Sequence, residues 1–315
     1  MKIFAASPVY LFNLGYESPS LLAPAFISVI PYSQNINLQF GLVGYSILAK
    51  TEYSRNKYLS IGISQDITPK NSNASIYQYT NGKRDEDLNY ENSTLLSQCY
   101  IRVKRTKDWS SQYSLINLNE TVNNTDNDKY WDKPHIGISI QENLRIVEYE
   151  DFFNNRWDGT KVSGNIEIFP NEKKWYRGQL TGGRAYFNQP WHLIISGKLF
   201  FSKNLNIVNQ FIVGSPWELD LLNFMQGSRY GEYRIHEGIL LNIRTDYEIK
   251  KIADIGLRIS FLYDGEESYL GYGFKIITIY EGLVFNVGLS ISGKKLKEGQ
   301  FNTPIVTSGV TFGIM

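Results

Sequence analysis

The sequence predicts an all-β protein, and more specifically a transmembrane antiparallel β-barrel. Helical periodicity is almost absent, whereas strict apolar–polar alternation recurs and is cleanest in the last third of the chain. Several alternating segments run to about ten residues or more, which matches a membrane-spanning strand better than the roughly 5–6 residues of a soluble strand. Aromatic residues make up 14% of the chain, with 22 tyrosines, yet the mean hydropathy is −0.29. Aromatic girdles around a polar lumen produce this combination in membrane barrels.

The alternation places apolar residues on one face of each strand and glycine, asparagine or charged residues on the other. The segment 283–291 is the clearest case, with one face formed by Leu283, Phe285, Val287, Leu289 and Ile291. The segments 239–248 and 270–278 follow the same rule. A soluble sandwich or barrel also alternates, with its apolar side inward, and sequence alone does not tell the inside from the outside. A soluble β-protein therefore stays open as an alternative.

We expect about sixteen strands in one antiparallel barrel. The segments that read as strands are 24–33, 36–50, 56–65, 73–80, 93–106, 110–118, 134–146, 160–170, 173–187, 190–202, 205–214, 237–249, 252–263, 268–279, 281–292 and 304–314. The Asn- and Asp-rich stretches 81–93, 119–133 and 149–160 read as long polar loops. Composition does not shift along the chain, so residues 1–315 are expected to form a single domain.

Composition argues against several classes of function. The net charge of +1 argues against nucleic acid as the main partner, because phosphate binding calls for a basic excess. Cys99 is the single cysteine, and the histidines His135, His192 and His236 are widely spaced, so no disulfide, metal site or cofactor is expected. No apolar stretch reaches the roughly 18 residues of a transmembrane helix, and the first residues lack a signal-peptide core. Either the protein is cytosolic or the numbering begins at a processed or truncated end, and the barrel prediction favours the second.

The segment 215–249 resembles the late barrel region of the BamA/TamA (bacterial surface antigen) superfamily, most closely its Bacteroidetes-type branches. The family signature reads Leu/Met-Arg-Gly-Tyr/Phe, then Gly-Arg-Tyr-Arg-Asp, then a strand that ends Glu-Tyr-Arg. Here 225–228 (Met-Gln-Gly-Ser), 231–235 (Gly-Glu-Tyr-Arg-Ile) and 246–248 (Asp-Tyr-Glu) fall on its three parts. The segments 14–22, 137–146, 157–169 and 270–276 are similar to other parts of the family in the same order.

The resemblance implies a loop that folds back into the lumen and is anchored to the barrel wall by its arginine. Gln226 stands in the place of that arginine, and Ser228 in the place of the aromatic residue. A charge-assisted hydrogen bond is stronger than a neutral one, so we expect a weaker anchor, with Arg229 or Arg234 as a substitute. The lumen-loop motif is thus expected to comprise Gln226, Gly227, Arg229, Gly231, Tyr233 and Arg234. The three glycines in the stretch 224–238 would also suit ordinary tight turns.

The strand after this loop carries Arg244, Asp246 and Glu248 on one face. In a barrel this face is expected to point into the lumen, where packing of the polar interior is the simpler role and solute selection the alternative. No histidine has a recognisable nucleophile beside it, so an enzyme is not expected.

The resemblance implies a location in the outer membrane of a Gram-negative bacterium and a role in the biogenesis or export of outer-membrane or surface components. Two departures matter: no POTRA domain precedes the barrel, and Met315 rather than an aromatic residue closes the chain, with Phe312 three residues inside. Protein partners are then expected to supply the periplasmic functions, with membrane lipid around the barrel. The family mechanism uses a weak seam between the first and last strands, expected here near Phe26 and Val310. A passive solute pore and a structural scaffold subunit are the alternatives.

Overall fold

A computed structural model describes residues 9–17, 21–43, 46–68, 75–80, 83–124, 129–131, 134–151, 156–170, 174–205, 210–214, 225–226, 228, 233–249, 252–280, 283–292 and 305–314. These residues contain no α-helix; they form one eighteen-stranded sheet and one two-stranded sheet. Within the same ranges, no helix has the length and apolar composition that a membrane span requires.

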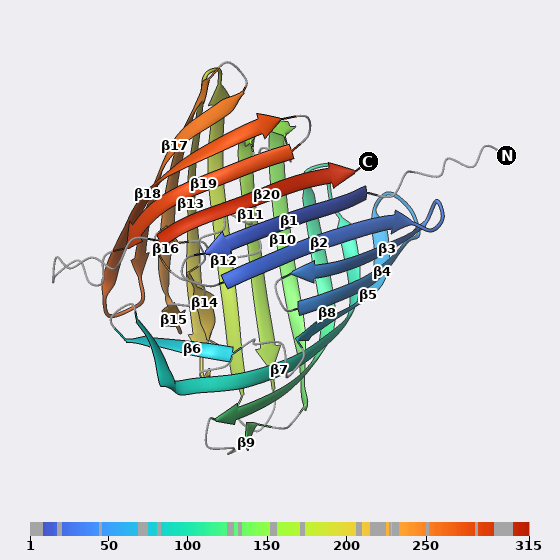
Figure 1. Ribbon diagram of the computed structural model, residues 1–315. Helices are drawn as coiled ribbons and strands as arrows, with labels where there is room; N and C mark the ends of the chain where they lie inside the picture. The colour runs from blue at the N-terminus through green and yellow to red at the C-terminus, as the bar shows by residue number, and fades with distance from the viewer. Residues whose placement is uncertain are drawn as a thin grey trace.

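Sixteen of the described strands pair side by side, each antiparallel to the next, and the pairing returns from the last strand to the first (Figure 1). In the order in which they pair, they are β1 (Val9–Glu17), β2 (Leu21–Pro31), β3 (Ile36–Val43), β4 (Ser46–Ser54), β5 (Leu59–Thr68), β7 (Lys83–Lys104), β8 (Trp109–Asn124), β10 (Pro134–Asp151), β11 (Arg156–Phe169), β12 (Trp175–Asn188), β13 (Trp191–Lys203), β16 (Gly238–Ile249), β17 (Ala253–Tyr263), β18 (Ser268–Tyr280), β19 (Leu283–Ser292) and β20 (Ile305–Ile314). The architecture is the antiparallel barrel that the sequence predicts.

Four short strands lie outside this ring. β6 (Ser75–Thr80) pairs with the first part of β7, and β9 (Lys129–Trp131) pairs with the last part of β8. Figure 1 shows them at the lower end of the barrel, where β7 projects beyond its neighbours. β14 (Phe211–Val213) and β15 (Tyr233–Ile235) pair only with each other among the described strands and form the second sheet.

The two ends of the barrel differ in the lengths of their connections. We call the end at which β1 begins and β20 ends the near end, and the opposite end the far end. Near-end connections are short, such as 32–35, 55–58, 105–108 and 189–190. The far end carries the longer connections, including 204–237 between β13 and β16 and 293–304 between β19 and β20.

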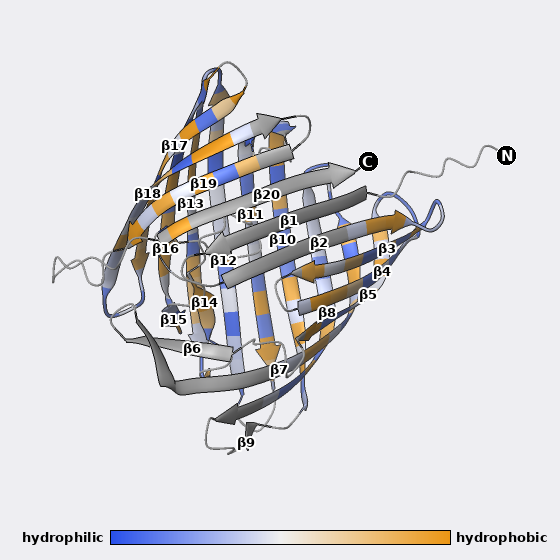
Figure 2. Ribbon diagram, in the orientation of Figure 1, coloured by the Kyte–Doolittle hydropathy of each residue, from blue (hydrophilic) through white to orange (hydrophobic). Residues whose placement is uncertain are grey.

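The two faces of the wall settle the question that the sequence left open. On β16 and β17, the apolar Leu241 and Leu257 are 47% and 48% exposed, whereas their chain neighbours Leu240 and Arg258 are 0% and 1% exposed. Figure 2 shows the alternation of hydrophobic and hydrophilic residues along β17 and β18. A soluble barrel hides its apolar face, whereas a barrel in lipid turns that face outward around a polar interior. The fold is therefore a transmembrane β-barrel.

Exposed aromatic side chains collect at both ends of the outer wall. The near end carries Tyr53, Trp109, Tyr113, Tyr186, Trp191 and Tyr247, and the far end carries Tyr176, Phe201 and Tyr263. Trp191 and Tyr247 face each other across β13 and β16 with ring centroids 4.9 Å apart. Aromatic rings in these positions suit the two membrane–water interfaces, because they present an apolar body and a polar tip.

The strand count agrees with the prediction, but four assignments in it were wrong. The sequence reading missed β1 and merged β3 and β4 into one strand over 36–50. It also counted 73–80 and 205–214 as barrel strands, whereas β6 lies outside the ring and only Phe211–Val213 of the second segment forms a strand, in the separate sheet. The start of β1 and the junction of β3 with β4 are apolar on successive residues, so alternation marks neither the strand nor the turn.

The three predicted polar loops were largely wrong as well. β7 begins at Lys83, β8 runs to Asn124, β10 runs to Asp151 and β11 begins at Arg156, so much of 81–93, 119–133 and 149–160 is strand. Asn and Asp are depleted in average strands, which led to the loop assignment. The extended ends of β7 and β8 still form ladder hydrogen bonds, because they pair with each other out to Tyr90–Asn124. An apolar face is not needed for this pairing.

The expected seam pair was also wrong. Phe26 lies on β2 and pairs with Phe12, whereas Val310 on β20 pairs with Leu14. The whole of β1 therefore lies between the two residues. The junction of the first and last strands is the β1–β20 ladder, which runs without interruption from Tyr10–Ile314 to Glu17–Thr307.

Candidate functional site

We call the connection from β13 to β16, residues 204–237, the lumen loop, of which the structure describes 204–205, 210–214, 225–226, 228 and 233–237. It joins the eleventh and twelfth strands of the ring at the far end and contributes β14 and β15. Met225 and Ser228 are fully buried, and Gln226 is 7% exposed. Their partners, described next, are inward-facing residues of the wall, so this part of the loop lies inside the barrel.

Gln226 is bound to the wall through its backbone. Its amide donates a hydrogen bond to the Ser260 hydroxyl at 2.9 Å, and that hydroxyl donates to the Asn242 side-chain oxygen at 2.5 Å. Ser228 closes a tight turn, because its hydroxyl donates to the Met225 carbonyl at 2.7 Å. The loop is thus tied to β16 and β17 by neutral hydrogen bonds in the described residues around Gln226.

Two glycines of β18 allow the loop to approach this closely. A Cβ at Gly271 would overlap the Gln226 carbonyl, and a Cβ at Gly273 would overlap the Gln226 side-chain amide and crowd Ser290. Both glycines face inward, since they pair with Ser260 and Arg258 of β17. Glycine is required here for the close contact of one backbone with another rather than for a turn.

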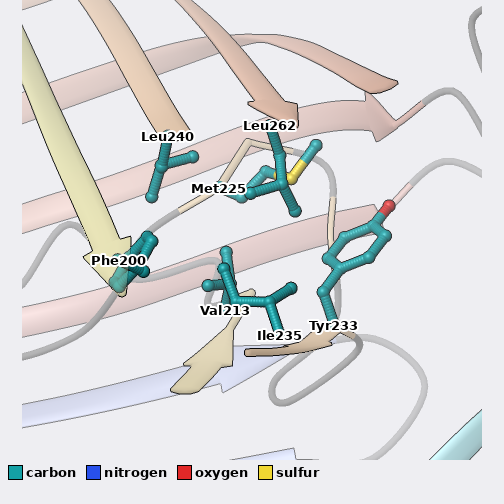
Figure 3. Close-up of a cluster of buried hydrophobic side chains, with 7 residues drawn as sticks. All are labelled: Phe200, Val213, Met225, Tyr233, Ile235, Leu240 and Leu262. Atoms are coloured by element: carbon teal, nitrogen blue, oxygen red, sulfur yellow. The ribbon is translucent and has the colours of Figure 1, made fainter. Parts of the chain in front are cut away.

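An apolar cluster holds the far-end part of the loop against the wall (Figure 3). The loop supplies Val213, Met225, Tyr233 and Ile235, and the wall supplies Phe200, Leu240 and Leu262. Tyr233 also packs on Tyr269 of β18 with ring centroids 4.7 Å apart. Removing a fully buried leucine from such a cluster costs about 2–5 kcal/mol. The cluster therefore stabilises the loop more than the single hydrogen bond at Gln226 does.

The loop is also fastened where it rejoins the wall. The Ser202 hydroxyl donates to the His236 carbonyl at 2.6 Å, and the Gln210 side-chain nitrogen lies 2.6 Å from His236 Nε2. The first contact joins β13 to the last part of the loop, and the second joins the first and last parts of the loop. This gives His236 a structural role.

The residues that the sequence assigned to the loop motif are only partly described. Gln226 lies on the wall as stated above, and Tyr233 and Arg234 lie on β15, where Arg234 pairs with Ile212. Gly227, Arg229 and Gly231 lie outside the described residues. Among the described residues of the loop, Gln226 is the one that lies on Ser260, Gly271 and Gly273.

Below the loop, Asp246 is the centre of a buried ion-pair network on the inner wall. It lies 2.6 Å from Arg244 on its own strand and 2.6 Å from Arg258 on β17. His192 Nδ1 of β13 lies 3.8 Å from the same carboxylate. Gly256 makes room for this pair, because a Cβ there would overlap both Asp246 and Arg258. Two guanidinium groups thus converge on one buried carboxylate.

A second ion-pair group lies closer to the near end. Arg156 at the start of β11 binds Asp254 of β17 with two nitrogens and Glu248 of β16 at 2.8 Å. The Asp254 side chain is 2% exposed and the Arg156 side chain 9%. Glu248, which the sequence placed with Arg244 and Asp246, therefore pairs with Arg156 instead of with those two residues in the described structure.

Arg156 reaches these acids because the β10–β11 hairpin bends inward at its near end. The β10–β11 register shifts between Val147 and Tyr149, and Gly159 has a φ of 137°. Such a bulge bends the strand that carries it. Trp157 is buried against Ala185 and Ile194 of the inner wall, and its carbonyl oxygen lies 3.1 Å from His192 Nε2. Arg156 and Trp157, the first residues of β11, are therefore fixed on the inner wall at the near end.

Four residues of the two ion-pair groups were missed from the sequence: Arg156, His192, Asp254 and Arg258. Asp254, Arg258 and Ser260 could have been found, because the alternation of 252–263 places them on one face. Gly271 and Gly273 carry a similar signal. The sequence around Arg156 carries no such signal. Arg156 lies 98 positions from Asp254 and reaches it because the hairpin bends.

Among the described residues, the histidines occupy structural positions. His135 packs against Phe169 and Trp175, His192 bridges Asp246 and the Trp157 carbonyl, and His236 contacts Gln210. No group of three or more His, Cys, Asp or Glu side chains in the described residues is arranged to hold a metal ion. The described part of the inner wall thus offers ion pairs and hydrogen bonds in the lumen.

Comparison with solved structures gives three barrels of similar fold. BamA from Haemophilus ducreyi lacking POTRA domains 1–3 superposes with a TM-score of 0.68 at 11% identity, over 97% of this chain and 70% of that one. CdiB from Acinetobacter baumannii gives 0.66 at 9% identity, over 98% and 60%. CdiB from Escherichia coli gives 0.63 at 8% identity, over 98% and 63%. The chain has the BamA and CdiB barrel fold.

At these identities the likeness establishes the fold. No protein-family model matches the sequence, and no curated protein matches it. The chain spans less than two thirds of either CdiB structure and 70% of the BamA structure. The solved structures therefore agree with the BamA/TamA resemblance of the sequence in the barrel fold.

Proposed function

We propose that this chain is an outer-membrane barrel of a Gram-negative bacterium that acts in the biogenesis or export of outer-membrane or surface components. The lumen loop carries the proposal: its Met225–Ser228 turn is buried and bound to Ser260, so the loop fills space that a solute pore would leave open. The BamA and CdiB fold supports the same reading. The function requires no catalytic group in the barrel.

The proposed mechanism uses the β1–β20 junction as a seam that opens sideways into the membrane. A substrate strand would pair with the exposed edge of β1 or β20, because an unpaired edge presents free amide and carbonyl groups. The lumen loop and the ion pairs around Asp246 would keep the β13–β18 wall rigid while the seam moves. Protein partners would bring substrates from the periplasm, and the surrounding lipid would receive them.

Depletion of the protein in its native cells tests this role. The expected result is a loss of outer-membrane or surface components from the membrane fraction, measured by quantitative proteomics and lipid analysis. Complementation with the wild-type gene should restore them. Normal membrane composition after full depletion would contradict the role.

Conductance in planar bilayers separates this role from a passive solute pore. The purified chain with a filled lumen should show little steady conductance. Large, steady openings of the wild-type barrel would favour the pore.

Purification from native membranes tests the role of a structural scaffold subunit. A scaffold subunit should co-purify with stable partners even where depletion leaves membrane composition unchanged.

A further inference from the structure

The near-end mouth of the lumen contains a polar cavity, on the side of the barrel formed by β4, β5 and β7. Its volume is about 410 Å³, and its lining includes Glu52, Ser60, Lys57, Arg102 and Lys104. The ion-pair groups around Asp246 and Arg156 lie on β11, β13, β16 and β17, which are other strands of the ring. The cavity is therefore separate from the lumen-loop site.

Positive charge dominates the cavity. Lys57, Arg102 and Lys104 line it, and Lys50 approaches Glu52 at 3.4 Å. Glu52 is the only carboxylate among the described residues that line the cavity. Lys57 and Lys104 are exposed, and cations gathered around one cavity repel one another, so an anion that binds between them relieves this repulsion.

Glu52 balances only one of these positive charges, and its oxygens are already occupied. It accepts hydrogen bonds from Ser60 at 2.9 Å, from Tyr100 at 2.7 Å and from Arg102 at 3.0 Å, in addition to the contact with Lys50. A carboxylate offers about four acceptor positions, and these four donors fill them. The second Arg102 nitrogen donates to the neutral Gln112 side chain at 2.8 Å. Glu52 therefore has no acceptor position left for Lys57 or Lys104, and an excess of positive charge remains in the cavity.

We propose that this cavity binds a phosphate group, carried either by a lipid headgroup or by a free phosphate ester. The unbalanced charge calls for an anion that carries more than one negative charge, which a phosphate does and a carboxylate does not. The Lys57 and Lys104 ammonium groups supply point charges, and the network of Glu52, Tyr100 and Gln112 holds the Arg102 guanidinium in place. The volume admits the phosphate together with part of its substituent.

Binding of inorganic phosphate to the full chain in nonionic detergent micelles tests the proposal. Isothermal titration calorimetry, with chloride at matched ionic strength as the reference, should show phosphate binding to the wild type. The double variant Lys57→Gln/Lys104→Gln should bind at least about tenfold more weakly, because it loses two charge-assisted contacts. The matched control is Lys174→Gln/Lys203→Gln, which removes two exposed lysines at the far end and should bind like the wild type.

A second titration distinguishes the two sources of the phosphate group. Phosphatidic acid, whose phosphomonoester carries up to two negative charges, and zwitterionic phosphatidylcholine are each added to the micelles. Binding of inorganic phosphate that depends on Lys57 and Lys104 supports a free phosphate ester. Binding of phosphatidic acid alone, with the same dependence, supports a lipid headgroup. Binding of neither ligand, or equal weakening in the control variant, overturns the proposal.

A charge-reversal variant keeps the test decisive if the double variant folds poorly. Lys104→Glu places a carboxylate in the cavity, so it should raise the unfolding temperature in the absence of phosphate and abolish phosphate binding. Most substitutions lower stability, so a rise is a specific expectation. A fall in unfolding temperature together with unchanged phosphate binding would also overturn the proposal.

Discussion

The backbone amide of Gln226 donates to the Ser260 hydroxyl while the Gln226 carbonyl lies directly over Gly271. One residue of the lumen loop thus contacts two neighbouring strands, β17 and β18, in the space that any side chain at position 271 would fill. This contact uses the backbone of the loop, so it does not depend on an arginine side chain. It accounts for how a loop with glutamine at this position is seated on the wall.

Gly271→Ala should displace the loop from the wall. The added Cβ overlaps the Gln226 carbonyl, so either the loop or β18 must move, and the hydrogen bond to Ser260 is lost. We expect a loss of about 1–3 kcal/mol in the free energy of unfolding and a higher conductance in planar bilayers. The control is Gly182→Ala, because a Cβ at Gly182 meets no atom within 4 Å. Wild-type conductance and stability in Gly271→Ala would show that the loop does not depend on this contact.

Asp246→Asn should be strongly destabilising. The substitution leaves Arg244 and Arg258 buried without their carboxylate, and such a loss typically costs about 3–5 kcal/mol. Denaturant unfolding in micelles, followed by tryptophan fluorescence, measures it. Adding Arg258→Met to the Asn variant should recover part of the loss, because one unpaired charge is then removed. Glu266→Gln in an exposed turn is the control and should change stability by less than about 0.5 kcal/mol. A neutral Asp246→Asn would contradict the network.

The barrel could be predicted from sequence because its signal is local and repeated. Along 283–291, alternation places Leu289 and Val287 on one face, and the structure exposes both of them. The strand assignments were wrong where an alternating pattern does not show whether an apolar residue faces lipid or the interior. The apolar Phe211 and Val213 read as a membrane strand, yet they pack inside against the lumen cluster, and an apolar residue has the same pattern in either place.

The candidate site was less predictable, because its contacts join distant parts of the chain. The polar face of β16 could be predicted from the sequence, so Arg244 and Asp246 could be expected together in the lumen. The partner of Glu248 could not be predicted. Arg156 reaches Glu248 because of a β-bulge and the positive φ of Gly159, and the alternation of apolar and polar residues indicates neither feature. Backbone approach is similarly hidden: the role of Gly271 becomes visible only once the loop lies against it.

Gly159→Ala should release the inward bend of the β10–β11 hairpin. A Cβ at this position overlaps the Ile146 carbonyl, and a φ of 137° is strained for alanine. Trp157 and Arg156 would then lose their places on Ala185 and Asp254, with a cost of about 1–3 kcal/mol or more. The matched control on the same strand is Gly164→Ala, where the Cβ makes only an ordinary contact with Leu180 at 3.7 Å. Equal unfolding midpoints for the two variants would show that the bend does not require glycine.

A disulfide across the β1–β20 junction tests both the register and the proposed seam. In a Cys99→Ser background, which removes the exposed native thiol, Leu14→Cys with Val310→Cys should crosslink, because paired positions on adjacent strands lie within disulfide reach. Phe26→Cys with Val310→Cys is the matched negative control, since β1 separates the two strands by two strand spacings, roughly 9–10 Å. If the seam must open, the crosslinked barrel should fail to complement depletion until a reductant is added. Full complementation by the crosslinked protein would rule out lateral opening, and a crosslink in the Phe26 pair would contradict the register.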